Sequence, residues 1–305
     1  MGETKGFIDL HIHSKYSDGH FGVKELIDKA QKNNTNFIAI CDHDSIKALK
    51  ELSSYLLDNM YSTTSVEFSS YLLLNGEKVL LHLLGYGFDP NNVELNKLLF
   101  ELRKRRLYIH NQFLKELKSN FANLPYDEIS KLDIERYCWF DRDVLNCINA
   151  NINDPILLSL ITNFFKTHKL SYGIDYPLNV EKVIDVINKS GGISVLAHPM
   201  AYNLSYDKIK TIIKKLVELG LRGIETFQSD CNQNDSIKLL QETERYKLLY
   251  SVGSDFHREI NSDNREIGKG INENLCISST SVSDYLLEKN LILKREIRNK
   301  NKENL

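Results

Sequence analysis

Two histidines separated by one residue, His11 and His13, are the first residues of this sequence that suggest chemistry. They end the apolar stretch 7–12, whose β-branched and aromatic residues predict a buried strand. Because strand side chains alternate between faces, Asp9 and both imidazoles point the same way. Two ring nitrogens at this spacing reach a single metal ion, and Asp18 follows on the turn just beyond. A strand with two exposed histidines is the alternative, which this stretch alone does not exclude.

Similar polar residues end further apolar stretches of the chain. They are Asp42 and His43 after 37–41, Glu67 after 65–66, His82 within 79–85, His198 after 192–197, Glu225 after 223–224, and Asp255 and His257 after 248–254. Taken alone, His82 is better explained as a hydrogen-bonded core residue. Yet six of the nine histidines fall at or near predicted strand ends. A core gives no reason for that concentration, so the pattern indicates a multinuclear metal site.

The elements that position these residues follow an α/β rhythm. Helical spacing of apolar residues occurs at 23–30, 180–190, 206–219 and 236–246, between the strand-like stretches. Asn33-Asn34 closes the first helix, and Asn75-Gly76 predicts a hairpin turn. Seven strand-like segments and right-handed crossovers predict a (β/α) barrel or a near relative, in which functional residues lie at the carboxyl ends of strands.

One interval departs from this rhythm. It opens with a long helical pattern between Leu95 and Leu117 and contains no ligand-like strand end. We therefore predict a barrel with the metal site from residues 1–91 and 177–290, an inserted helical cap at 92–176, and a charged tail at 291–305. Within the cap, Arg103, Arg106 and Arg142 are the candidates for contact with a phosphate, although a solvated basic helix face is the simpler explanation for any one of them.

The composition restricts the class of protein and its partners. The chain has 305 residues and a net charge of −2, which gives no electrostatic footprint for duplex nucleic acid, although a local basic groove remains possible. Five scattered cysteines form no C-x-x-C pair, so no disulfide framework is expected. No apolar run has the length of a signal peptide core or a membrane span. We expect a cytoplasmic protein that binds neither membranes nor long nucleic acid; the sequence indicates no protein partner.

Together these motifs resemble those of the PHP (polymerase and histidinol phosphatase) superfamily. The matching stretches, in order, are Asp9-Leu-His-Ile-His with Asp18-Gly19, Cys41-Asp-His43, Val66-Glu67, His82, Ala197-His-Pro199 and Gly253-Ser-Asp-Phe-His257. The resemblance is closest to stand-alone phosphoesterases with a helical insertion, which act on nucleotides and on short oligonucleotide 5′ ends. It implies a distorted (β/α)7 barrel and three divalent metal ions.

The resemblance also implies which residues bind these ions. His11, His13, Glu67 and Asp255 would hold the first ion, Glu67, His82 and His198 the second, and Asp18, His43 and His257 the third. This mixture of nitrogen and oxygen ligands suits Mn²⁺, Zn²⁺ or Fe²⁺. Asp9 and Asp42 are expected to orient imidazoles, and Glu225 to form a wall of the site.

The expected activity is hydrolysis of a phosphate monoester, of a nucleotide or a short oligonucleotide, by a metal-bridging hydroxide. No protein nucleophile is needed, and His20 is an additional candidate acid. A departure from the family concerns the cap, where Phe140 to Asp143 replaces an Arg-Pro-His element, so the substrate cannot be taken from any one relative. The alternatives are a histidinol-phosphate phosphatase, an exonuclease on short RNA, and a metal-binding domain without catalysis.

Overall fold

The first two strands form a parallel βαβ unit. The computed structural model describes residues 6–132, 140–172, 177–259 and 264–295, without the side chains of 140–142 and 168–172. Strand β1 (Phe7–Ile12) pairs with β2 (Thr35–Ile40), and α1 (Val23–Lys32) connects them. The predicted helix is confirmed, and it ends at Asn33 because Asn34 turns the chain with a φ of 55°.

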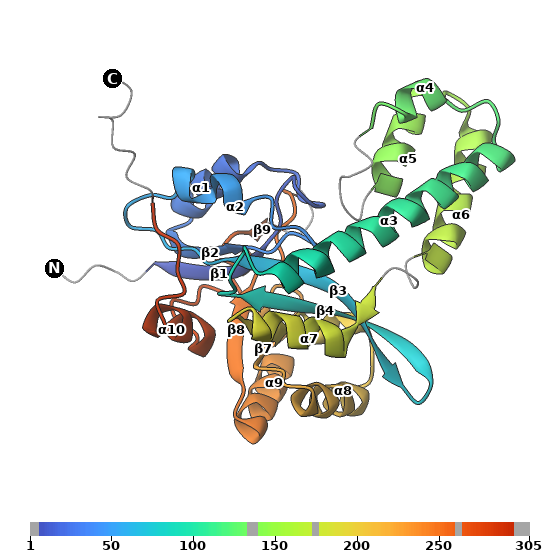
Figure 1. Ribbon diagram of the computed structural model, residues 1–305. Helices are drawn as coiled ribbons and strands as arrows, with labels where there is room; N and C mark the ends of the chain where they lie inside the picture. The colour runs from blue at the N-terminus through green and yellow to red at the C-terminus, as the bar shows by residue number, and fades with distance from the viewer. Residues whose placement is uncertain (1–5, 133–139, 173–176, 260–263, 296–305) are drawn as a thin grey trace, which may run out of the picture.

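Six strands form a second sheet in the order β5-β3-β4-β6-β7-β8 (Figure 1). They are β3 (Ser65–Leu74), β4 (Glu77–Tyr86), β5 (Leu178–Asn179), β6 (Ile193–Leu196), β7 (Gly223–Gln228) and β8 (Leu249–Gly253). β3 and β4 are an antiparallel hairpin around Asn75-Gly76, whose positive φ angles of 53° and 86° fit the predicted turn. β4 pairs with β6 in antiparallel fashion, and β6, β7 and β8 are parallel.

Isolated bridges connect the two sheets. Ile12 bridges Phe256 beyond β8, and His43 bridges Glu67 on β3. Near the first bridge, the backbone N–H of Asp255 donates to the carbonyl of His11 at 2.8 Å. The fold is mixed α/β, but the (β/α)7 barrel is not confirmed. Among the described residues the sheets meet through single bridges, and no helix separates β3 from β4.

Helices cover the strands and supply the core. α7 (Val180–Lys189) packs on β3, β4 and β6, α9 (Gln233–Tyr246) on β7 and β8, and α10 (Ser281–Glu288) on β8. The smaller elements are α2 (Leu49–Tyr55), η1 (Pro199–Tyr202), α8 (Tyr206–Glu218), β9 (Arg265–Glu266) and β10 (Gly270–Ile271). Beyond α10, the backbones of Leu293 and Ser62 exchange hydrogen bonds of 2.7 and 3.1 Å, so the described chain stays in contact with the strands up to that residue.

A group of four helices extends away from the sheets (Figure 1). It consists of α3 (Val93–Asn120), α4 (Tyr126–Ile129), α5 (Phe140–Asn151) and α6 (Pro155–Tyr172). The first half of α3 joins the main core through Leu95, Leu98 and Leu102. Its second half packs with α5 and α6 in a separate cluster that includes Phe113 and Ile148. α3 therefore belongs to both parts of the molecule.

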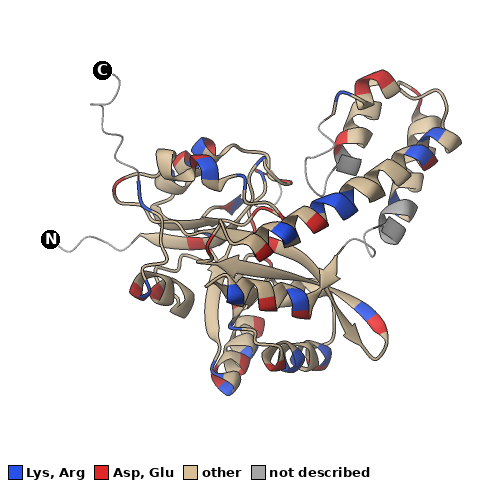
Figure 2. Ribbon diagram, in the orientation of Figure 1, with Lys and Arg blue, Asp and Glu red and all other residues tan. Residues whose placement is uncertain are grey.

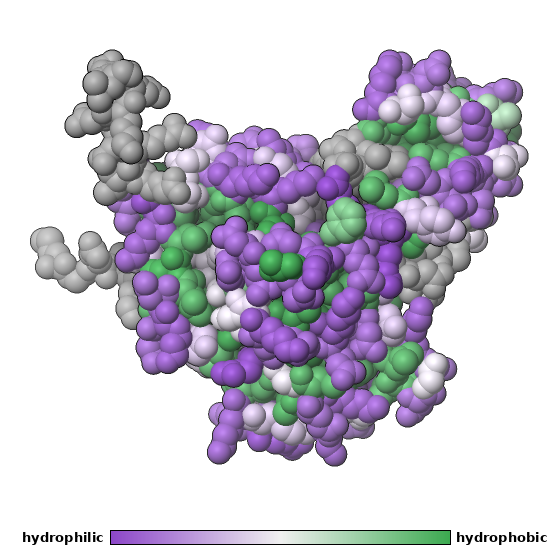
Figure 3. Space-filling view, viewed as in Figure 1, coloured by the Kyte–Doolittle hydropathy of each residue, from purple (hydrophilic) through white to green (hydrophobic). Residues whose placement is uncertain are grey.

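The surface of the molecule is mixed in character. Figure 2 shows acidic and basic residues interspersed along α3, α7 and α9. In Figure 3 the viewed face is mostly hydrophilic, and its apolar residues form small separate patches. Among the helices of the described part of the chain, none combines the length and the apolar character needed to cross a membrane.

Candidate metal centre

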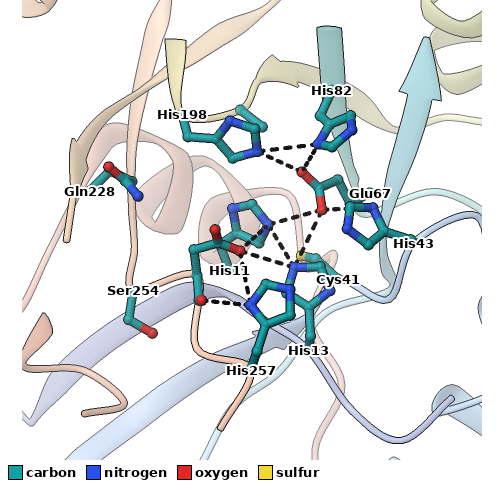
Figure 4. A network of polar contacts seen from close by, with 12 residues as sticks. His11, His13, Cys41, His43, Glu67, His82, His198, Gln228, Ser254 and His257 are labelled. Atoms are coloured by element: carbon teal, nitrogen blue, oxygen red, sulfur yellow. Dashed lines mark hydrogen bonds and ion pairs between the residues drawn. The ribbon is translucent and has the colours of Figure 1, made fainter. Parts of the chain in front are cut away.

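Glu67 lies at the centre of a cluster of imidazoles (Figure 4). β3 places its side chain in the interior, where it is 1% exposed. Its Oε1 lies 3.0 Å from Nδ1 of His82 and 2.9 Å from Nε2 of His198. Its Oε2 lies 3.0 Å from Nδ1 of His43 and 3.3 Å from Nε2 of each histidine of the His-x-His motif. One carboxylate thus contacts five imidazoles from four segments of the chain.

The two histidines of that motif face each other and share Asp255. The Nε2 atoms of His11 and His13 are 3.1 Å apart, and Oδ1 of Asp255 lies 3.5 and 3.1 Å from them. Nδ1 of His11 contacts Glu225 at 3.0 Å. When that nitrogen carries the proton, Nε2 of His11 presents a lone pair to the space between these side chains.

Asp18 contacts His257, the sixth imidazole of the cluster, and two of the imidazoles already described. It lies 2.9 Å from Nε2 of His257, 3.3 Å from Nδ1 of His13 and 3.7 Å from Nε2 of His43. Its turn requires Gly19, because a Cβ there would lie 2.2 Å from the carbonyl oxygen of His13. Since the other ring nitrogen of His43 faces Glu67, His43 adjoins two groups of ligands, whereas the resemblance assigned it to one.

The donor atoms suit divalent cations. Three groups converge, each with its ligand atoms within 4.8 Å of one another: His13, Asp18, His43 and His257; His11, His13 and Asp255; His43, Glu67 and His82. Within the described structure, Oε2 of Glu67 is buried and makes no hydrogen bond, although three ring nitrogens are close to it. Buried nitrogen and oxygen atoms that converge on one space are the arrangement that a metal ion requires, once it displaces the protons of the imidazoles.

The cluster has anionic carboxylates in a buried setting. Burial would raise the pKa of Glu67 and of Asp255, but the neighbouring imidazoles outweigh it and hold both well below the usual value. Burial lowers the pKa of His13, yet Asp18 and two other carboxylates reverse this effect and raise it to about 10. Burial prevails at His43, whose pKa falls to about 3. Cations bound among these groups would therefore displace protons.

Glu225 connects two of the candidate ligands. Besides contacting Nδ1 of His11, it accepts a 2.7 Å hydrogen bond from the backbone N–H of His198 through Oε2. A Cβ on Gly253 would lie 2.3 Å from Oε1 of this glutamate, so only glycine leaves room for it. The sequence placed Glu225 at a strand end but did not reveal its contact with an imidazole.

Asp9 and Asp42 were expected to orient imidazoles. Asp9 instead accepts a 2.9 Å hydrogen bond from the backbone N–H of Ser254, and Asp42 accepts from the hydroxyls of Ser14 and Ser17, both at 2.6 Å. These aspartates hold the loops that carry the ligands. In the described structure neither contacts an imidazole ring, so the expectation is not confirmed; short side chains at these positions reach backbone and hydroxyl donors first.

The candidate substrate contacts differ in position. Arg106 is 5% exposed, and its Nη2 binds Asp44 at 2.9 Å. Arg103 lines a cavity beside that ion pair. His20 is exposed, and its backbone N–H donates to the carbonyl of His257. The side chain of Arg142 lies outside the described residues.

Comparisons with known proteins identify the class. The mixed α/β fold and the buried groups of His, Asp and Glu define the class as a candidate metal-binding protein. Residues 9–118 match the family model described as the PHP domain. Over these residues the match confirms the resemblance recognised in the motifs of the sequence. A solved structure from Chromobacterium violaceum, an amidohydrolase with bound sulfate and no metal, has a TM-score of 0.73 and 24% identity, covering 94% of this chain and 97% of its own. One from Bifidobacterium adolescentis has a TM-score of 0.68 and 23% identity, covering 92% and 95%.

Three relatives of known activity align with 82% of the chain. The phosphoribosyl 1,2-cyclic phosphate 1,2-diphosphodiesterase of Eggerthella lenta is 27% identical over 254 residues, which is 93% of its length. A 5′-3′ exoribonuclease of Haemophilus influenzae is 27% identical over 89% of its length. The 3′,5′-nucleoside bisphosphate phosphatase of C. violaceum is 26% identical over 87% of its length.

Proposed function

We propose that this protein is a metal-dependent phosphoesterase that hydrolyses a phosphate monoester of a nucleotide or of the 5′ end of a short oligonucleotide. The carboxylate of Glu67, set among five imidazoles, carries the proposal, because such an arrangement holds several cations side by side. Relatives named for nucleoside bisphosphate and RNA substrates support the nucleotide class.

The proposed ligands are those expected from the sequence, with one addition. They are His11, His13, Glu67 and Asp255; Glu67, His82 and His198; and Asp18, His43 and His257, for three ions of Mn²⁺, Zn²⁺ or Fe²⁺. His43 also faces Glu67 and His82, so we add it to the second group. Bound ions would lower the pKa of water and neutralise phosphoryl oxygens.

The neighbouring side chains favour water as the nucleophile. The hydroxyls of Ser14 and Ser17 donate to Asp42 at 2.6 Å. The thiol of Cys41 is buried and contacts the carbonyl of Leu10 at 3.2 Å, and burial raises its pKa. Each of these groups is already engaged, so a covalent intermediate on them is disfavoured.

We further propose that the helices of residues 92–176 form a cap that selects the substrate, with the rest of the PHP domain in residues 1–91 and 177–290. The first half of α3 contacts the loop after His43, so this helix connects the cap to the centre. Arg103 and Arg142 are the proposed phosphate contacts. Arg106 is assigned instead to holding Asp44.

Phosphate release by purified protein tests the function. Protein is stripped of metal, reloaded with Mn²⁺ and assayed with nucleoside 5′-monophosphates, 3′,5′-bisphosphates, 5′-phosphorylated dinucleotides and histidinol phosphate. We expect turnover of at least one nucleotide, and a loss of at least a hundredfold in Glu67→Gln, which retains shape but removes the charge.

The matched control is Glu242→Gln, which changes another buried glutamate that accepts from the hydroxyl of Tyr206 and belongs to none of the three ligand groups. It should keep both activity and bound metal. Folded Glu67→Gln with near-normal turnover would overturn the proposal, as would the absence of turnover by metal-loaded wild type across the whole panel.

A further inference from the structure

A cavity of about 250 Å³ lies between the first turns of α3 and the loop 44–47. Its lining residues are Tyr16, Asp44, Ser45, Ile46, Lys47, Asn96, Leu99, Phe100, Arg103 and Arg106. The helix contributes one face, because residues three and four apart lie beside each other on α3. The loop contributes the opposite wall.

The walls combine apolar, aromatic and cationic groups. Ile46 and Leu99 belong to or pack on the main hydrophobic core and form an apolar base. Tyr16 and Phe100 bring two aromatic rings to the same cavity. Phe100 is 66% exposed, so its ring is accessible to a ligand in the cavity. Arg103 adds a positive charge at the side.

The cavity adjoins the metal centre along the chain. Tyr16 lies in the loop between the candidate ligands His13 and Asp18, and Asp44 directly follows His43. Tyr16 is fixed, because its hydroxyl donates to Glu51 and its backbone N–H donates to the Ser14 hydroxyl. The loop that carries His13 and Asp18 therefore also presents a fixed aromatic ring to the cavity.

We propose that this cavity binds the nucleobase of the substrate, with the base against Phe100 and Tyr16. The inference rests on the proposed function and narrows it to substrates that carry a base, excluding base-free sugar phosphates. Stacking on aromatic rings suits every base. The amide nitrogen of Asn96 donates to the carbonyls of Pro90 and Asn92, which leaves its Oδ1 as an acceptor for an exocyclic amino group.

Paired substrates measure the contribution of the base. Adenosine 5′-monophosphate and ribose 5-phosphate carry the same 5′-phosphate ester, but only the first carries a base. We expect wild type to favour the nucleotide in kcat/KM, and Phe100→Ala to reduce that preference on the order of tenfold, the usual effect of removing one stacking ring. Phe100→Tyr should retain it.

The matched control is Tyr108→Ala, since Tyr108 is a ring of α3 with 63% exposure that does not line this cavity. It should leave the preference unchanged. A second readout needs no turnover: metal-depleted protein is titrated with 2-aminopurine riboside 5′-monophosphate. The fluorescence of this base is quenched when it stacks on an aromatic ring. Quenching should be lost in Phe100→Ala and kept in Tyr108→Ala.

The outcomes separate the two proposals. If both substrates are turned over and the preference for the nucleotide is the same in wild type and Phe100→Ala, the base site is overturned and the phosphoesterase proposal stands. No turnover together with quenching that depends on Phe100 overturns the phosphoesterase and keeps the base site. Quenching that is the same in Phe100→Ala and wild type overturns the base site whatever the turnover.

Discussion

At the scale of single residues, Glu225 contacts two candidate ligands, His11 and His198, and is placed to orient them. It accepts from the ring of His11 at 3.0 Å and from the backbone of His198 at 2.7 Å. Glu225→Gln replaces one acceptor oxygen by an amide donor. This donor either faces the backbone N–H of His198 or donates to Nδ1 of His11, which moves the ring proton to Nε2, the atom that faces the other ligands. We expect the affinity for Mn²⁺ to fall by roughly 10- to 100-fold, as when other partners of ligand histidines are removed. Isothermal titration of metal-depleted protein measures it.

Glu242→Gln is again the control, because that glutamate is buried but belongs to none of the three ligand groups. Rescue by Glu225→Asp, even in part, would support the orienting role. Unchanged affinity in folded Glu225→Gln would show that His11 keeps its orientation without this partner.

The protons of the cluster give a second prediction at this scale. Carboxylates around His13 raise its pKa to about 10, so in metal-free protein this imidazole is protonated at neutral pH. A metal ion must displace that proton. The affinity for Mn²⁺ should therefore rise with pH between about 6 and 8. Titrations in buffers of different ionisation enthalpy should detect the release of protons when metal binds. A metal affinity that does not depend on pH, with no proton release, would contradict this prediction.

At the scale of elements, the ion pair between Asp44 and Arg106 attaches α3 to the metal-binding loop. Both side chains are buried, and the second carboxylate oxygen of Asp44 accepts from the backbone N–H of Ser69 on β3. Arg106→Ala leaves a buried carboxylate without its partner, so we expect a loss of about 3–5 kcal/mol in the free energy of unfolding. Urea denaturation measures it.

Arg105→Ala is the neighbouring control. Arg105 is partly exposed and pairs with Glu101 at the surface, so its loss should cost at most about 1 kcal/mol. Removing both partners, in Asp44→Asn with Arg106→Met, should cost less than Arg106→Ala alone. Equal effects of Arg105→Ala and Arg106→Ala would mean that the buried pair does not anchor the helix.

Local patterns were enough to predict most elements. The helix at 23–30, the turn at Asn75-Gly76 and the long helix from Leu95 to Leu117 are confirmed, because each depends on spacing or turn chemistry within a few residues. The closed barrel is not confirmed, since closure depends on how distant strands meet. The apolar stretch 79–85 does not reveal that β4 runs antiparallel to both its neighbours.

The candidate ligands could also be named from the sequence, because each lies in or directly after an apolar stretch. Their partners could not. Glu225 contacts a ring that is 214 residues away in the chain, and Arg106 pairs with Asp44 across 62 residues. Such contacts depend on the packing of whole elements, which no short pattern contains.

At the scale of the whole molecule, the helices beyond the sheets have their own core. Ile148 on α5 is fully buried there. Ile148→Ala should destabilise this cluster by about 2–5 kcal/mol and increase hydrogen exchange in α5 and α6, while metal content stays unchanged. Leu160→Ala, at an exposed site on α6, is the control. Loss of bound metal in Ile148→Ala would show that the two cores are coupled.

The bridge between Ile12 and Phe256 joins opposite ends of the described chain. During synthesis, β1 therefore leaves the ribosome on the order of ten seconds or more before its neighbour exists. Throughout that time its apolar side chains lack a partner on one edge. The nascent chain also carries the His-x-His pair before it carries Asp255, so we expect it to hold a cation only weakly until that aspartate has been synthesised.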